Sequence, residues 1–457
     1  MKKILVTALL ATGLVPLVRQ DSSASHAGAS PDGSAEVLEL LARSSHPLIL
    51  EGDPQDVYVH VALAAAELPA LPRPAMNLAL VIDRSGSMGS EDKLTHAKSA
   101  AEQLVGRLRE GDRLAVVAYD DEIATLVPSA PVGDRRVFLE AIRGLTSGGS
   151  TDLYGGVTAG CEEVLRHVDR ERLNRVVLLS DGLPTVGITA PDEIRAQAAR
   201  FRERGVHIST MGMGLSYDDV LLRGIAARAG GKYYYVRTAE SVGDHLDHEI
   251  DQLTRIVGGE IEVRLALGNG VEAWEVIGAP HRFEAGEVVV ALEDLASGAQ
   301  DKFVVRLRVQ AKTQVAGAAQ PLVTATLRYL DRTSNEARIV HAPPLSCATT
   351  DSAEAVELSR NLDVLVQAEI VHNARALLSA MDLQRAGGFD AARELLENRY
   401  RNSKLLNDTE YKSSELTRML MGIRQTLLDL ERTASDTRAS RDFQLSTDLL
   451  GLGYLGY

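Results

Sequence analysis

The chain has 457 residues and a formal net charge of −14. This length exceeds that of one ordinary domain and predicts two or three. A composition of 45% hydrophobic and 25% charged residues is typical of a folded globular protein, and the acidic excess argues against nucleic acid or an anionic membrane surface as the main partner.

The amino terminus has the pattern of a secretory signal. Lys2 and Lys3 precede an apolar run, Ile4–Val18, that is too short for a membrane span. The small residues Ala27-Gly28-Ala29 provide a cleavage site. We therefore predict a signal peptide at residues 1–29, export to the periplasm, cell surface or exterior, and no transmembrane span after its removal. The alternative is an uncleaved anchor.

The next segment changes from linker to strand. Residues 30–55 are rich in Gly, Ser and Ala and then briefly helical in pattern, which predicts a linker. Asp56–Leu63 alternates valines with more polar residues, as expected of a strand with one buried face. No strand of the same kind adjoins it, so we assign residues 56–73 to a β-sandwich whose other strands lie later in the chain.

A polar loop follows the next apolar run. In Asn77–Met88, NLALVIDRSGSM, the run ends on Asp83, and Ser85 and Ser87 follow at alternate positions. A short continuous apolar run is typical of a buried strand in a parallel sheet, and open α/β sheets bind ligands beyond the carboxyl ends of their strands. We expect the three side-chain oxygens to face one point, with Gly86 allowing the loop to curl.

Helix and strand patterns then alternate up to residue 255. Apolar residues recur at helical spacing over Leu94–Leu108, with Ser90 as the expected N-cap. This alternation predicts a doubly wound, mostly parallel sheet over residues 74–255. The further strands are expected at Arg113–Tyr119, around Thr125, and at Arg175–Ser180, Val206–Gly214 and Lys232–Val236; the further helices are expected at Asp134–Ile142, Val157–Val168, Asp192–Arg204, Asp218–Ala229 and Ser241–Leu253.

The pattern DxSxS resembles the metal-ion-dependent adhesion site of von Willebrand factor type A domains, which integrin inserted domains share. That family also has a Thr in a downstream loop and an Asp after a later strand. Thr151 in SGGSTDLYGG and Asp181 after RVVLLS match these positions. The resemblance covers Pro74–Leu253 and implies five metal-site residues: Asp83, Ser85, Ser87, Thr151 and Asp181.

The resemblance also implies how such a site works. In the family the serines and the threonine contact the metal, the aspartates often act through water, and one coordination position is left for a carboxylate of the partner. Oxygen ligands without Cys or His favour Mg²⁺, with Mn²⁺ or Ca²⁺ as alternatives. We therefore expect a protein partner that presents Asp or Glu.

Beyond Gly258 the pattern is of strands alone. Gly268-Asn269-Gly270 supplies a turn, and Trp274 is expected in the core. These strands predict a β-sandwich over residues 256–345, joined by the strand at Asp56–Leu63, so that the α/β domain is an insertion. This layout resembles inter-alpha-trypsin-inhibitor heavy chains and bacterial chloride-channel-regulator homologues. The predicted strands are Ile261–Leu267, Val271–Ile277, Glu287–Leu292, Lys302–Gln310 and Leu322–Leu330.

The remainder is predicted to be a helical region, residues 346–435, after a hinge at Ala342–Ser352, and then a tail, residues 436–457. Helical patterns on both sides of Gly387-Gly388 indicate a helical hairpin, either a cap on the other domains or a repeat-like interaction surface. The two cysteines are expected to stay unpaired, Cys161 as a buried thiol and Cys347 as a surface thiol, and the alternative is a disulfide between them.

The leading hypothesis is a binding protein that is not an enzyme and has no catalytic residues. The first alternative is a Mg²⁺-dependent hydrolase, since an Asp at a strand end can attack phosphorus. Haloacid-dehalogenase-like enzymes, however, place a second Asp where this chain has Ser85. The second alternative is a scaffold whose metal only stabilises the fold.

Overall fold

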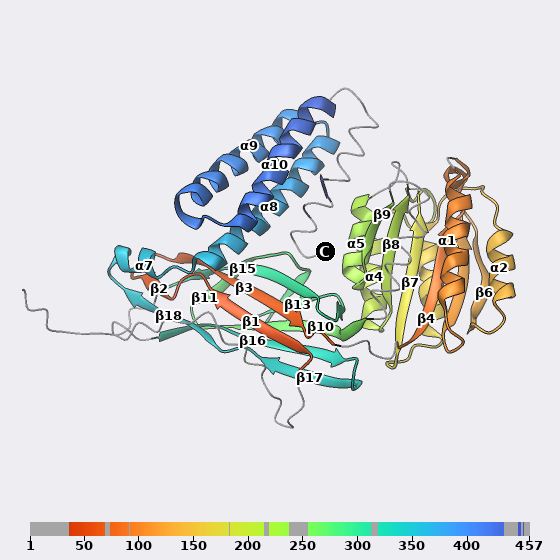
Figure 1. Ribbon diagram of the computed structural model, residues 1–457, viewed down its shortest axis with the longest axis horizontal. Helices are drawn as coiled ribbons and strands as arrows, with labels where there is room; N and C mark the ends of the chain where they lie inside the picture. The colour runs from red at the N-terminus through yellow and green to blue at the C-terminus, as the bar shows by residue number, and fades with distance from the viewer. Residues whose placement is uncertain are drawn as a thin grey trace, which may run out of the picture. The chain divides into compact units, whose positions relative to one another are not determined.

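Three β-sheets organise the part of the chain that is described by the structure. This structure is a computed structural model (Figure 1). It describes residues 36–68, 74–90, 92–181, 183–213, 219–236, 255–311, 319–433, 447–448 and 451. The predicted signal peptide, the predicted helix Ser241–Leu253 and most of the tail lie outside these residues. All the elements below belong to the unit Val37–Tyr457.

The six-stranded sheet forms the α/β domain, with strand order β6-β5-β4-β7-β8-β9. Its neighbouring strands pair in parallel except β5 and β6, which are antiparallel. The central strands β4 and β7 are almost wholly buried, as their continuous apolar runs predict. The bounds are β4 (Ala75–Asp83), β5 (Arg113–Tyr119), β6 (Ile123–Pro131), β7 (Arg172–Ser180), β8 (His207–Met213) and β9 (Tyr233–Val236).

Helices cover both faces of this sheet, because alternate residues of β4 point to opposite sides. Leu78, Leu80 and Ile82 pack with α1 (Lys93–Arg107) and α2 (Arg135–Arg143). Ala79 and Val81 pack in the other core. That core also contains α3 (Leu153–Leu165), α4 (Pro191–Glu203) and α5 (Asp219–Ala229).

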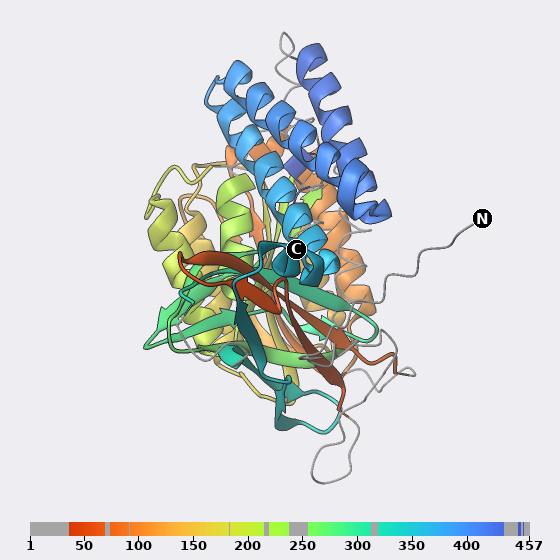
Figure 2. The same ribbon diagram turned by 90° about the vertical axis from the view of Figure 1, so that its left-hand side faces the viewer.

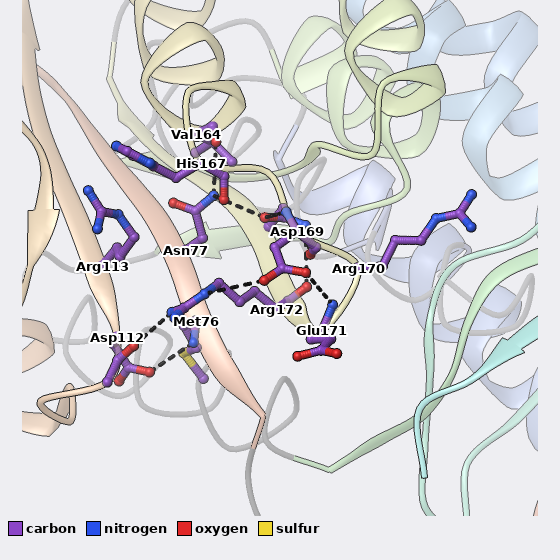
Figure 3. Close-up of polar contacts among 12 residues, drawn as sticks. Met76, Asn77, Asp112, Arg113, Val164, His167, Asp169, Arg170, Glu171 and Arg172 are labelled. Atoms are coloured by element: carbon purple, nitrogen blue, oxygen red, sulfur yellow. Dashed lines mark hydrogen bonds and ion pairs between the residues drawn. The ribbon is translucent and has the colours of Figure 1, made fainter. Parts of the chain in front are cut away.

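Buried polar contacts fix the starting ends of the central strands (Figure 3). The Asn77 side chain donates to the carbonyls of Val164 and His167, at 2.8 and 3.0 Å. It also donates to Asn174 Oδ1 at 2.9 Å, and so ties the end of α3 to both β4 and β7. The first part of β4 is therefore held in place, and with it the position of the far end of the strand.

The other two sheets form the sandwich and share one core. The strand predicted at Asp56–Leu63 belongs to β3 and pairs with β15, from Gln55 opposite Val309 to Ala64 opposite Gln300. The α/β domain therefore lies within the sandwich sequence, between β3 and β10. One sheet has the order β1-β3-β15-β11: β1 (Leu38–Ser44), β3 (Gln55–Ala65), β15 (Gln300–Val309) and β11 (Val271–Ile277).

The second sandwich sheet has the order β12-β13-β10-β16-β18-β2, with β14 paired to β10 and β17 paired to β16. These pairings are antiparallel except β18 with β2, which is parallel. The bounds are β2 (Leu48–Leu50), β10 (Ile256–Leu267), β12 (His281–Glu284), β13 (Glu287–Ala291), β14 (Leu295–Ala296), β16 (Ala319–Asp331), β17 (Glu336–His341) and β18 (Leu345–Thr350).

Helices follow the sandwich, and α8, α9 and α10 run side by side (Figures 1 and 2). The bundle packs on the outer face of the β1-β3-β15-β11 sheet through Tyr58, Ile277 and Val304. Among the described helices, none is both long and apolar enough to cross a membrane. The helices are α7 (Ala353–Ser359), α8 (Leu362–Arg385), α9 (Phe389–Leu406) and α10 (Ser414–Thr433).

This architecture confirms the predicted fold class, a doubly wound α/β sheet with a β-sandwich and carboxyl-terminal helices. The helical hairpin also occurs as predicted, since α8 and α9 flank Gly387-Gly388. Several local predictions were wrong. The segment predicted as linker contains β1 and β2. Leu38–Ser44 looked briefly helical because Leu, Glu, Ala and Arg are strong helix formers, but its burial alternates as in a strand.

Two further corrections concern the end of the sandwich and a helix cap. The predicted hinge contains β18, which buries the Cys347 thiol that we expected at the surface. Ser90 does not cap α1, since Asp92 occupies the N-cap position in a left-handed conformation. The Ser90 hydroxyl instead donates to the carbonyl of Ser87 at 2.7 Å.

Trp274 is 59% exposed and is not in the sandwich core. The pairing of β11 with β15 shifts register between Ala273 and Glu275, which is a bulge that turns the indole outward. The indole instead lies beneath the guanidinium groups of Arg306 and Arg308, at 5.4 and 5.2 Å from the ring centre.

The first prediction concerns Asp301, which shares a face of β15 with the buried Phe303 and Val305. Burial raises the pKa of Asp301 from 3.8 to about 7. Because the folded pKa exceeds the unfolded one, this group contributes stability below about pH 4 that is lost as the pH rises through about 7. Asp301→Asn should therefore raise the free energy of unfolding at pH 8 by about 1–2 kcal/mol and flatten its dependence on pH.

Urea unfolding between pH 4 and 8 measures this effect. Asp53→Asn, at an exposed loop position, is the matched control and should leave the profile unchanged. A profile of Asp301→Asn that runs parallel to the wild type would contradict the assignment.

Candidate metal centre

The carboxyl ends of β4 and β7 lie side by side because these strands pair in parallel, with Ile82 opposite Leu179. An aspartate lies at this edge of the sheet in each case: β4 ends on Asp83, and Asp181 follows β7 directly. Both carboxylates are fully buried. A parallel pair of strands thus places two negative charges together although they are far apart in the sequence.

Hydrogen bonds connect these carboxylates to both serines of the DxSxS pattern. The Ser87 hydroxyl donates to Asp181 Oδ1 at 2.8 Å and lies 3.1 Å from the Ser85 hydroxyl. The Ser85 backbone N–H donates to Asp83 Oδ1 at 2.8 Å. Four of the five predicted residues therefore form one connected group.

Thr151 lies in a loop that contacts both aspartate-bearing loops. The Gly86 N–H donates to the Gly149 carbonyl at 3.1 Å, two residues before Thr151. The Thr151 N–H donates to the Thr185 hydroxyl and its carbonyl accepts from the Thr185 N–H, both at 2.9 Å. Thr151 is also buried. The structure therefore brings the fifth predicted residue to the same edge of the sheet.

The glycine that this arrangement needs is Gly149, whereas we expected Gly86. Gly149 has φ +73°, and an added Cβ would come within 2.0 Å of Asp121 Oδ1. At Gly86 an added Cβ would make only an ordinary contact of 3.5 Å. Glycine is therefore required at position 149 because the Thr151 loop packs closely there, whereas the conformation of the serine loop does not require a glycine at position 86.

Two residues that sequence reasoning missed hold the second oxygen of Asp83. The Ser180 and Tyr119 hydroxyls donate to Asp83 Oδ2 at 3.0 and 3.2 Å. Burial raises the pKa of Asp83, and the charge of Asp181 adds to this rise. Both new residues end strands next to the site, so their positions at strand ends were the available signal.

Lys93 is the second omission, and it contacts the site directly. Its ammonium group lies 2.6 Å from Asp181 Oδ2, and Lys93 is only 7% exposed. The residue comes from the first turn of α1, which follows the serine loop. No spacing rule in the sequence indicates that this lysine turns inward, because lysine at a helix start usually faces water.

The chemistry of these side chains fits a hard divalent cation. Two carboxylates against one ammonium leave a net negative charge, and the remaining groups are hydroxyls. Ser87 is exposed while the two aspartates are buried, so the site has one open side. Across the described ranges no three His, Cys, Asp or Glu side chains gather as a metal cluster, so a site here would depend on its hydroxyls.

The fold and the site define a class of protein: an α/β domain with an oxygen-lined loop site at the carboxyl edge of its sheet. A family model of the von Willebrand factor type A domain matches residues 77–248, and this part of the chain is a von Willebrand factor type A domain. Domains of this family mediate protein–protein interactions and are generally not enzymes.

Relatives share this domain but are much longer. The uncharacterized protein YfbK of Escherichia coli is 30% identical over 212 residues, which cover 46% of this chain and 37% of that protein. The human inter-alpha-trypsin inhibitor heavy chain H6 is 22% identical over 57% of this chain and 21% of its own length. The chain thus spans well under half of these relatives.

A solved structure has the same fold over nearly the whole chain. The von Willebrand factor type A protein from Catenulispora acidiphila superposes with a TM-score of 0.69, covering 90% of this chain and 96% of that one. At 16% identity this similarity concerns the fold alone.

The second prediction tests the role of Lys93. Lys93→Met keeps the length of the side chain but removes the charge that competes with a cation for Asp181. Affinity for Mg²⁺ or Mn²⁺ should rise by at least about tenfold, since unit charges about 4 Å apart interact by about 1–4 kcal/mol between water and a protein surface. Without metal, the lost buried ion pair should cost about 3 kcal/mol of stability.

Titration calorimetry and thermal unfolding with and without chelator measure both effects. Lys98→Met is the control, because Lys98 lies on the same helix and bonds the exposed carbonyl of Arg143. Unchanged or weaker metal binding by Lys93→Met would show that this lysine does not compete with a cation.

Proposed function

We propose that the chain is an exported binding protein whose type A domain captures an acidic side chain of a protein partner through a bound divalent cation. The observation that carries this proposal is the group formed by Asp83, Ser85, Ser87 and Asp181, with Thr151 in the adjoining loop. The family's general role in protein–protein interaction supports the same conclusion.

The protein side chains divide the work of such a site. The serine and threonine hydroxyls would be direct ligands, while the aspartates, held by neighbouring donors, would supply charge from behind them. A divalent cation, Mg²⁺ in the first instance and Mn²⁺ or Ca²⁺ as alternatives, would supply an open position for a carboxylate of the partner. The exposed Ser87 marks the side from which that carboxylate would enter.

Lys93 favours capture of an external acidic group. Its ammonium lies beside Asp181, and even after a cation displaces it from direct contact its positive charge would lower the net negative charge of the site. A cation that is under-neutralised by the protein attracts a further carboxylate more strongly. Lys93 therefore favours an acidic partner over a purely structural metal.

Asp83 is poorly placed to act as a nucleophile, which counts against the hydrolase alternative. Three donors occupy its two oxygens, namely the Ser85 N–H and the hydroxyls of Tyr119 and Ser180. If the protein hydrolysed phosphate esters and Asp83→Asn abolished this activity, the hydrolase alternative would replace the binding protein as the leading hypothesis.

Export is part of the proposal and depends on the amino-terminal sequence. Lys2, Lys3 and the apolar run Ile4–Val18 fit a signal segment that is removed near residue 29. We place the mature protein in the periplasm, at the cell surface or outside the cell.

The third prediction tests cation-dependent capture. The tagged protein is incubated with an envelope extract in Mg²⁺, washed, and eluted with chelator. Bound partners should elute with chelator, and Asp83→Ala should retain less than about a tenth of them, because loss of one buried charge removes several kcal/mol of cation binding.

Asp192→Ala is the control, since Asp192 is exposed on α4 and, among the residues that the structure describes, pairs with Arg195 alone. It should capture the same partners as the wild type. Partners that stay bound through chelation in equal amounts would contradict the mechanism. A large gain in thermal stability with Mg²⁺ and no effect on capture would instead support a structural metal.

A further inference from the structure

A cavity of about 780 Å³ lies where residues of the α/β domain meet those of the sandwich. It is lined from the start of β7, the connection from α4 to β8, and strands β10, β12 and β13. Sites for small molecules typically have volumes of about 300–1,000 Å³. Figure 3 shows part of this end of the sheet, where Arg170 points away from the network of Asn77 and Asp169.

This cavity is remote from the candidate metal centre. Arg175 lines it and Asp181 belongs to the metal centre, six positions farther along β7 and its end. At about 3.3 Å per residue the two places are about 20 Å apart. They lie at opposite edges of the same sheet.

Three arginines form the inner wall, Arg175 from β7, Arg202 from α4 and Arg332 from the turn after β16. Among the described residues Asp294 is the carboxylate whose charge acts on all three, with Arg175 at 3.4 Å, and Glu293 acts on Arg202 as well. The side chain of Asp294 is 5% exposed. Arg202 donates to the Leu292 carbonyl, which accepts a hydrogen bond but brings no full negative charge.

The guanidinium group of Arg332 is incompletely hydrogen-bonded among the described residues. One of its guanidinium nitrogens donates to the Arg170 carbonyl at 2.6 Å, and its Nε is buried without a hydrogen-bond partner in the described residues. Within the same residues neither Arg202 nor Arg332 has a carboxylate at ion-pair distance. Two guanidinium groups therefore line the cavity without a carboxylate at ion-pair distance, although the charge of Asp294 acts on both from farther away and that of Glu293 acts on Arg202.

The other titratable groups of the wall do not supply the missing charge. Glu262 is already paired with Arg264 and Arg282, and Glu203 and Glu260 are exposed to solvent. Asp169 is tied to Arg172 and to the turn that follows it. Burial lowers the pKa of His207, so this ring is neutral at pH 7 and adds no positive charge.

An uncompensated cation in a protein interior is costly, whereas a guanidinium group forms paired, charge-assisted hydrogen bonds with an oxyanion. We propose that this cavity binds a small oxyanion ligand, a phosphate ester or a polycarboxylate, whose oxygens accept from Arg202 and Arg332. Because Arg202 belongs to the α/β domain and Arg332 to the sandwich, the ligand would join the two. This site is independent of the metal centre and of the proposed adhesive role.

The fourth prediction is tested on the full chain with pyrophosphate and citrate as probes, in a phosphate-free buffer of constant ionic strength. Pyrophosphate represents the phosphate class and citrate the polycarboxylates. At about 10 mM, at least one probe should raise the thermal midpoint, as expected for a ligand that binds only the folded state. Titration calorimetry should give one site per chain.

Arg332→Gln should lose at least about tenfold in affinity for that probe, equal to about 1.4 kcal/mol. Arg202→Lys keeps the charge but removes the planar fork, so it should fold normally and lose at least about fivefold. Arg282→Gln at the rim is the control, because Arg282 is already paired with Glu262 and Glu284. Its affinity should match the wild type.

Binding by neither probe at about 10 mM would overturn the proposal, because a site with two unpaired guanidinium groups should bind well within that range. Binding that Arg202→Lys leaves unchanged would overturn it too, since the anion would then lie elsewhere. The metal-dependent capture of partners can succeed or fail without altering either result.

Discussion

The parallel pairing of β4 with β7 is the contact on which the rest of the site depends. It places Asp83 and Asp181 at one edge of the sheet, both fully buried. Two buried carboxylates repel each other, and they can stay together only if other groups compensate them. The serine loop, the ends of neighbouring strands and helix α1 therefore supply donors: serine hydroxyls, a tyrosine, a backbone N–H and the ammonium group of Lys93.

This compensation is incomplete in a way that suits a binding site. One ammonium cannot neutralise two carboxylates, and the exposed Ser87 leaves one side of the group open. Lys93 and a divalent cation both draw on Asp181, so the lysine sets how strongly the site holds a metal. The buried contacts of Asn77 at the opposite edge keep the central strands in register, and they thereby maintain the geometry of the candidate metal centre at the far end of these strands.

Much of this could be predicted from the sequence because the strongest signals are periodic or local. Continuous apolar runs revealed β4 and β7, and residues directly after a strand have few places to go, so Asp83 and Asp181 could be placed at one edge. Lys93 could not be predicted in this way. Its inward turn depends on a buried carboxylate that comes 88 residues later.

The failures in the sandwich have a similar origin. Trp274 was expected in the core because strand alternation was assumed to continue, but a bulge reverses its direction. β2 and β18 are short, and they pair with each other although Leu48 and its partner Ala348 are 300 positions apart, so no local pattern reveals the pairing. The arginine cavity was missed for the same reason, since its residues come from the inserted domain and from the sandwich strands that follow it.

A crystal structure of the protein with Mn²⁺ tests the central claim most directly. The account predicts one anomalous peak about 2 Å from the hydroxyl oxygens of Ser85, Ser87 and Thr151, with the Lys93 ammonium displaced from Asp181. A fully occupied Mn²⁺ bound elsewhere, with the contact between Lys93 and Asp181 intact and no peak at these hydroxyls, would contradict it.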